Sequence, residues 1–88
     1  MDRGTRLKRL HFRAWHRGTR EADYLMGGFF DRYHRGWGEA EIGWFEALVD
    51  EEDVDVLDWV LGAAAVPERY QGELITAMQR LDFVEIIR

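Results

Sequence analysis

The sequence predicts an all-α protein, a compact bundle of about five short helices. Apolar residues recur at helical spacing in successive segments, and no segment alternates convincingly as a strand. Short polar or glycine-containing breaks separate these segments, so neighbouring helices are expected to be joined by short connections. The chain has 88 residues, of which 47% are hydrophobic and none is cysteine, so packing alone must hold the core. We therefore expect one domain over residues 1–88.

Two helices are expected in the N-terminal part of the chain. The first spans roughly Thr5–His16 and is closed by Gly18. The second has one continuous apolar face, formed by Ala22, Leu25, Met26, Phe29, Phe30 and Tyr33. Gly27 and Gly28 lie inside this helix, where each costs about 1 kcal/mol relative to alanine. They indicate either the close approach of another helix or a locally weak helix.

A third helix is expected to begin after Gly38 and to end near Asp50. Two glutamates in its first turn complement the positive end of the helix macrodipole. If Gly38 is the N-cap, Trp37 and Ile42 have the spacing of a hydrophobic staple, in which two apolar side chains meet across the start of a helix.

Two shorter helices are expected in the C-terminal half. Asp53 is placed to cap the fourth helix, and Gly62 ends it. Pro67 opens the fifth helix, whose apolar face is formed by Tyr70, Leu74, Ile75, Met78 and Leu81. The tail, residues 82–88, alternates only weakly, and its pattern is compatible with an extended, a helical or a flexible segment.

Charge is distributed unevenly along the chain. Residues 1–20 contain seven basic residues and one acid, whereas residues 39–60 contain nine acids and no base. This segregation predicts a charge polarity suited to orienting a protein partner. The net charge of −5 disfavours binding to nucleic acid. The basic N-terminal segment keeps that alternative open through Arg3, Arg6, Arg9, Arg13 and Arg20.

The sequence contains no recognisable catalytic or metal-binding set. There is no cysteine or serine nucleophile, and no glycine-rich loop follows a strand. His11 and His16 are at a spacing that places them on different sides of a helix, and the acidic run from Asp50 lacks the glycine of a calcium-binding loop. No segment approaches the roughly 20 apolar residues that span a bilayer. We expect no catalytic residue, no metal site and no independent enzymatic activity.

The junction of the first two helices carries a polar cluster over residues 16–21. One interpretation is structural: if Gly18 closes the first helix and also caps the second, Glu21 falls at the third helical position and can reach back to a free backbone N–H. Arg17 would then pair with Glu21 across the turn. The other interpretation is that this exposed cluster binds carboxylates or an acidic patch on a partner.

The residues of this junction resemble a known family. The block Arg17-Gly18-Thr19-Arg20-Glu21 is similar to the RGxxE motif of the FAD assembly factor family of succinate dehydrogenase, small bacterial proteins related to mitochondrial succinate dehydrogenase assembly factor 2. The similarity continues in order with Asp23, the aromatic-rich second helix and the block Asp53-Val54-Asp55-Val56-Leu57-Asp58-Trp59, and it covers roughly Thr5–Leu81. His16 stands where relatives often carry a second arginine, which alters the charge of this surface near neutral pH.

The resemblance implies an assembly role. Family members bind the flavoprotein subunit of succinate dehydrogenase, and in some bacteria that of fumarate reductase, and promote covalent attachment of FAD to a histidine of that subunit. Because the flavoprotein supplies much of the chemistry, the chain is expected to bind no cofactor stably, and FAD is attached to the partner. We expect docking to select a conformation that aligns histidine and flavin.

The resemblance also implies which residues bind the partner. They are His16, Arg17, Gly18, Arg20, Glu21 and Asp23, with Arg17 as the principal polar anchor. The protein is expected to act in the bacterial cytoplasm, to be a monomer when free, and to bind neither nucleic acid nor the membrane interior. The alternative function is a small helical adaptor or a nucleic-acid-binding regulator that uses the basic N-terminal helix.

Overall fold

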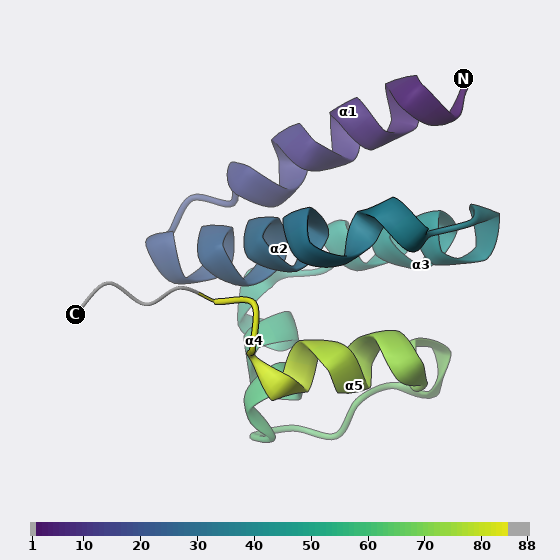
Figure 1. The fold of residues 1–88 in the computed structure, drawn as a ribbon. Helices are drawn as coiled ribbons and strands as arrows, with labels where there is room; N and C mark the ends of the chain where they lie inside the picture. Colours follow the sequence, from purple (N-terminus) through teal and green to yellow (C-terminus); the bar gives the residue numbers. More distant parts are fainter. Residues whose placement is uncertain (1, 85–88) are drawn as a thin grey trace.

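The computed structural model describes residues 2–84. This part of the chain contains five α-helices and two short 3₁₀ helices, joined by loops. The α-helices are α1 (Arg3–Trp15), α2 (Arg20–Tyr33), α3 (Glu39–Val49), α4 (Asp53–Leu61) and α5 (Glu73–Arg80), and the 3₁₀ helices are η1 (His34–Gly36) and η2 (Glu68–Tyr70). In Figure 1, α1 lies along one side of α2 and α3, and α5 lies on the other side. The prediction of an all-α bundle is confirmed.

The helix ends follow from local hydrogen bonding. The Asp2 carboxylate accepts the Thr5 N–H at 2.7 Å and caps α1. At α3, Gly38 is the N-cap, and its own N–H donates to the Glu41 carboxylate at 2.8 Å. Gly62 closes α4 with φ 81°, a left-handed conformation that glycine adopts without steric cost. The predicted Gly38 and Gly62 boundaries are therefore confirmed.

Two predicted helix starts are wrong, as is the interpretation in which Gly18 also caps the second helix. Thr19 caps α2, and its hydroxyl accepts the Ala22 N–H at 3.2 Å. Asp53 is the first residue of α4 rather than its cap, which is Glu52. Pro67 precedes only the short η2, because Gly72 at φ 141° interrupts the backbone before α5 begins at Glu73.

Aromatic side chains form the centre of the core. Phe29 of α2 is fully buried, and its ring lies 6.1 Å from that of Phe45 and 5.3 Å from that of Phe83, centroid to centroid. Trp37 and Ile42 are both buried at the start of α3, as the staple spacing predicts. Phe83 is only 7% exposed and Val84 packs against the core, so these two residues of the tail lie on the bundle. The rest of the predicted tail, residues 85–88, lies outside the described residues.

The two glycines inside α2 mark close approaches. A Cβ atom on Gly27 would overlap the indole of Trp15, the last residue of α1, whose Cε3 atom would be 2.7 Å away. A Cβ atom on Gly28 would lie 3.3 Å from the ring of Phe83. Both glycines thus allow close packing, but not the backbone approach of another helix: the neighbour of Gly27 is the indole ring of Trp15, and that of Gly28 is Phe83, which follows α5.

Replacement of Gly27 should therefore destabilise the protein. In Gly27→Ala the added methyl group displaces the Trp15 indole, and overpacking of this kind costs about 1–3 kcal/mol of unfolding free energy, which the gain of about 1 kcal/mol in helix propensity offsets only in part. Urea unfolding measures the change. Gly43→Ala on α3 is the control, because a Cβ there meets open space and the better helix former should stabilise by about 0.5–1 kcal/mol. Equal effects of the two substitutions would contradict the close packing of Trp15 on Gly27.

Ion pairs join the basic α1 to the acidic α3. The Arg6 guanidinium donates to Glu46 through Nε at 3.0 Å and Nη2 at 2.7 Å, and to Glu39 through Nη1 at 2.6 Å. These hydrogen bonds lower the pKa of both carboxyl groups below their ordinary value of 4.5. Arg3 adds a longer contact to Glu39, and Arg13 pairs with Asp50 at 2.6 Å. The two blocks of charge thus face each other along one helix pair.

The lowered pKa values predict an acid-dependent contribution to stability. A carboxyl group whose pKa is lower in the folded state stabilises the fold above its unfolded pKa, and this contribution is lost as the pH falls through the folded pKa. The destabilisation caused by Glu46→Gln should therefore be largest near neutral pH and should shrink as the pH falls below 4.5. Urea midpoints from neutral pH down to about pH 3 measure it. Glu68→Gln, an exposed glutamate on η2, is the control, and a pH-independent effect of Glu46→Gln would contradict the interaction.

Candidate functional site

The connection between α1 and α2 is a short loop with a defined backbone. His16 follows α1, Gly18 has φ 112°, and Thr19 is extended as the N-cap of α2. The φ of Gly18 lies in a region that side chains with a Cβ disfavour, and open space surrounds the position where a Cβ would lie. Glycine is therefore needed here for the conformation of the loop and not for close packing.

Arg17 is held at both its backbone and its side chain. Its N–H donates to the Asp23 carboxylate at 2.6 Å, its Nε donates to Asp53 Oδ1 at 2.8 Å, and its Nη2 donates to the Glu51 carbonyl at 3.3 Å. The side chain is only 10% exposed. The predicted pairing of Arg17 with Glu21 is wrong, because the guanidinium crosses to the turn between α3 and α4.

A second set of hydrogen bonds fixes the turn that receives Arg17. The Glu51 carboxylate accepts the Tyr70 hydroxyl at 2.6 Å and an Arg69 N–H at 2.9 Å. These bonds, the one from Tyr70 first, lower the pKa of Glu51. Burial, together with the bond to Glu51, raises the pKa of the Tyr70 hydroxyl. The turn that carries the Glu51 carbonyl and Asp53 is thus held in place by hydrogen bonds from two residues of η2.

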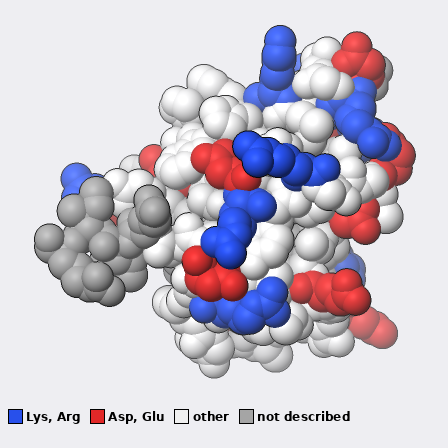
Figure 2. Space-filling view, viewed as in Figure 1, with Lys and Arg blue, Asp and Glu red and all other residues white. Residues whose placement is uncertain are grey.

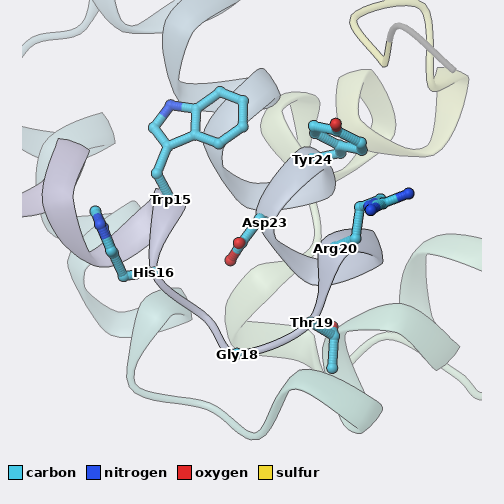
Figure 3. Close-up of a pocket in the computed structure, with 7 residues that line it drawn as sticks. All are labelled: Trp15, His16, Gly18, Thr19, Arg20, Asp23 and Tyr24. Carbon is cyan, nitrogen blue, oxygen red and sulfur yellow. The ribbon is translucent and has the colours of Figure 1, made fainter. Parts of the chain in front are cut away.

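The remaining motif residues face outward. His16, Gly18, Arg20 and Glu21 are exposed, and neither Arg20 nor Glu21 forms an ion pair within residues 2–84. Figure 3 shows an open pocket at the loop, in which Asp23 points toward the loop and Arg20 points away from it. The structure therefore divides the six predicted binding residues. Arg17 and Asp23 hold the loop, and the other four form its accessible surface.

His16 is oriented by its neighbour one helical turn earlier. Its ring stacks on Phe12 with centroids 3.9 Å apart, and its Nδ1 atom lies 2.6 Å from the Phe12 carbonyl oxygen. Phe12 itself is 61% exposed. The histidine therefore presents a flat, partly aromatic surface at the edge of the loop rather than a freely rotating base.

The charge polarity predicted from the sequence is much reduced in the fold. Arg3, Arg6, Arg13 and Arg17 of the basic segment pair with Glu39, Glu46, Asp50 and Asp53 of the acidic segment. On the face seen in Figure 2, basic and acidic side chains lie next to one another instead of forming separate patches. Since Arg3, Arg6 and Arg13 belong to the arginines considered for phosphate contacts, this pairing lowers the positive charge available to nucleic acid.

Comparison with known proteins decides the family. The family model described as the flavinator of succinate dehydrogenase matches residues 8–82, which include the whole α1–α2 loop and the turn that binds Arg17. The chain belongs to this family.

Relatives of this flavinator family occur in bacteria and in mitochondria. The FAD assembly factor SdhE of Acetobacter pasteurianus is 34% identical over 73 residues, which cover 83% of this chain and 67% of the relative. Mitochondrial succinate dehydrogenase assembly factor 2 is 32% identical in Mycosarcoma maydis and 29% identical in Dictyostelium discoideum, where the match covers 32% and 51% of the relative. The chain thus spans only about a third to a half of these mitochondrial relatives.

Within residues 2–84, the flavinator-family chain shows no group of three or more histidine and acidic side chains placed to hold a metal ion. None of its helices in this range combines the length and hydropathy needed to cross a membrane. The pocket at the loop is lined by polar and by aromatic side chains. Among the aromatic ones are Trp15 and Tyr24, whose rings meet edge to face at 6.1 Å. The features at the loop that can act chemically are exposed charges and aromatic surface, which suit contact with a macromolecule.

Asp53 is the residue of this arrangement that motif analysis missed as a partner of Arg17. Its place in the block of residues 53–59 was recognised, but nothing in the sequence links it to an arginine 36 positions earlier. Glu51 was likewise seen only as part of an acidic break. One signal could have linked Arg17 to Asp53: both residues belong to family motifs, and both lie near the start of a helix.

Loss of the Asp53 carboxylate should weaken the fold through Arg17. Asp53→Ala leaves the largely covered Arg17 side chain without its charged partner and should cost about 1–3 kcal/mol of unfolding free energy. Asp55→Ala is the control, since Asp55 is also an acid of the first turn of α4 but is exposed and forms no ion pair among the described residues. Urea unfolding of both variants measures the difference. Equal losses of unfolding free energy in the two variants would show that Asp53 stabilises only the start of α4 and not the position of Arg17.

Proposed function

We propose that this protein binds the flavoprotein subunit of succinate dehydrogenase through the α1–α2 loop and promotes covalent attachment of FAD to that subunit. The membership of the flavinator family and the relative named FAD assembly factor support the activity. The assignment of the loop rests on which of its residues are held in place and which are exposed. Arg17 and Asp23 fix its backbone, and Gly18, Arg20 and Glu21 remain exposed on it.

The proposed mechanism is conformational and needs no catalytic residue in this chain. A loop that is already rigid loses little conformational entropy on docking, so more of the contact energy is available to favour one conformation of the partner. If that conformation aligns the flavin with the acceptor histidine, alignment alone can lower the barrier by several kcal/mol. FAD is then a group attached to the partner and not a cofactor of this protein.

The proposal assigns a distinct role to each motif residue. Glu21 and Arg20 contact polar groups of the flavoprotein, because their charges are unpaired within residues 2–84. Gly18 lets the partner approach the backbone closely, since nothing occupies the space beside it. Arg17 holds the loop and, as the polar anchor, reaches the partner with the small exposed part of its side chain. His16 adds a stacked aromatic edge.

We extend the proposal to the flavoprotein subunit of fumarate reductase, which the resemblance of the sequence to this family suggests. We also propose that the protein acts as a monomer. The bacterial cytoplasm is the proposed place of action, in keeping with a bacterial relative and a chain without cysteine.

Substitution of the exposed motif charges should reduce flavin attachment. Glu21→Ala removes a carboxylate available to the partner, and loss of one charged hydrogen bond at an interface should weaken binding about tenfold or more. The flavoprotein is expressed together with each variant, and covalent flavin is read by in-gel fluorescence at limiting amounts of the variant. Arg20→Ala and Arg17→Ala are tested in the same way.

Glu73→Ala is the matched control, because Glu73 is an exposed glutamate in the first turn of α5 and lies far from the loop in the sequence. Arg17→Ala also breaks the internal contact with Asp53, so its unfolding curve is recorded in parallel. Undiminished flavin attachment with both Arg17→Ala and Glu21→Ala would overturn the assignment of this loop.

A further inference from the structure

An apolar groove lies next to the α1–α2 loop and is not used by the proposal above. Its apolar lining comes from α2, from the second half of α4 and from the residues after α5, and consists of Leu25, Leu57, Val60, Leu61, Leu81 and Val84. Leu61 is 65% exposed and Leu81 is 37% exposed. Two of the four large apolar side chains most exposed within residues 2–84 therefore share this one depression. Clustered exposure of this kind marks interaction surfaces more often than single exposed side chains do.

The backbone at Leu81 is a second, independent observation. Leu81 follows α5 with φ 56° and is the only residue other than glycine with a positive φ among residues 2–84. Glycine usually occupies this position after a helix, because a side chain there crowds the backbone. A leucine that is both strained and exposed contributes little to the stability of the isolated fold. Strained residues of this kind are typical of sites that contact a ligand or partner.

The groove is continuous with the motif loop. Arg20 and Tyr24 line both the groove and the pocket shown in Figure 3, and Glu21 stands at the rim of the groove. Arg20 and Glu21 have no ion-pair partner within residues 2–84, in contrast to Arg17. As far as residues 2–84 show, the rim therefore presents one positive and one negative charge outside any ion pair, beside an apolar floor.

The size of the groove limits what can fill it. Among the residues that the structure describes, nine line it, whereas a stable protein dimer uses roughly 20–30 residues from each side. A single segment of a partner fits this footprint better than the whole face of a second copy does. Because the same residues form the rim of the groove and the exposed part of the motif, the segment is expected to belong to the partner that the motif binds.

We propose that the groove receives an apolar segment of the flavoprotein subunit, with side chains of leucine size seated between Leu57, Leu61 and Leu81 and with a carboxylate that meets Arg20 at the rim. This inference rests on the proposed function. It adds an apolar anchor to a polar contact. Burial of Leu61 against such a segment would contribute affinity that the motif charges alone do not supply.

The test compares two exposed apolar residues of α4. Leu61→Gln removes apolar surface from the groove, and Val54→Gln makes the matched change at a residue that is 63% exposed and does not line the groove. The dissociation constant of each full-length variant for the purified flavoprotein subunit is measured by isothermal titration calorimetry. Leu61→Gln should weaken binding about tenfold or more, and Val54→Gln should leave it unchanged.

The failure of this inference is separable from that of the proposed function. If Leu61→Gln binds like the unaltered protein while Glu21→Ala binds more weakly, the groove is not a docking site and the motif assignment stands. If Arg17→Ala, Glu21→Ala and Leu61→Gln all bind normally, both the groove and the assignment of the loop fail.

One other occupant of the groove is tested with the same variants. If sedimentation velocity shows that the unaltered protein dimerises and Leu61→Gln is monomeric, the groove joins two copies of the chain. That result would overturn docking of the flavoprotein there.

Discussion

The contact of Arg17 with the turn between α3 and α4 joins two parts of the chain that lie 36 residues apart. On one side, Arg17 belongs to the loop that carries the family motif. On the other side, Asp53 and the Glu51 carbonyl accept its hydrogen bonds, and Glu51 is itself held by Tyr70 and Arg69. Hydrogen bonds from a charged donor of low exposure are strong and directional, so the loop adopts one geometry. The exposed surface formed by Gly18, Arg20 and Glu21 depends on this contact.

Much of the fold could be predicted because its information is local. The periodic apolar face of α2, the glycines that flank α3 and α4, and the staple at Trp37 all act within one or two helical turns. The start of α5 was misplaced for a reason of the same kind. Pro67 is compatible with a helix start, but its φ also suits the isolated 3₁₀ turn that is observed. Sequence alone does not tell these two outcomes apart.

The candidate site was only partly predictable, because its decisive contacts join residues distant in sequence. Residues 16–21 were singled out from the motif, yet Arg17 was paired with Glu21, its neighbour along the chain. The same limitation explains the misjudged charge polarity. Basic residues near the N-terminus and acids in the middle look separated on the printed sequence, but α1 and α3 lie side by side in the same direction, so that Arg3 meets Glu39, Arg6 meets Glu46 and Arg13 meets Asp50. Segregation along a chain predicts polarity only when the segments do not pack together.

The packing of Trp15 on Gly27 has a consequence for how this sequence can vary. Trp15 is the last residue of α1, so the depth at which its indole rests on α2 sets where the chain leaves α1 and enters the motif loop. The side chains at positions 15 and 27 therefore share one limited space. A side chain at position 27 becomes tolerable only if residue 15 shrinks by a comparable amount, and the loop would then leave α1 at a different height. Across relatives, these two positions should change together or not at all.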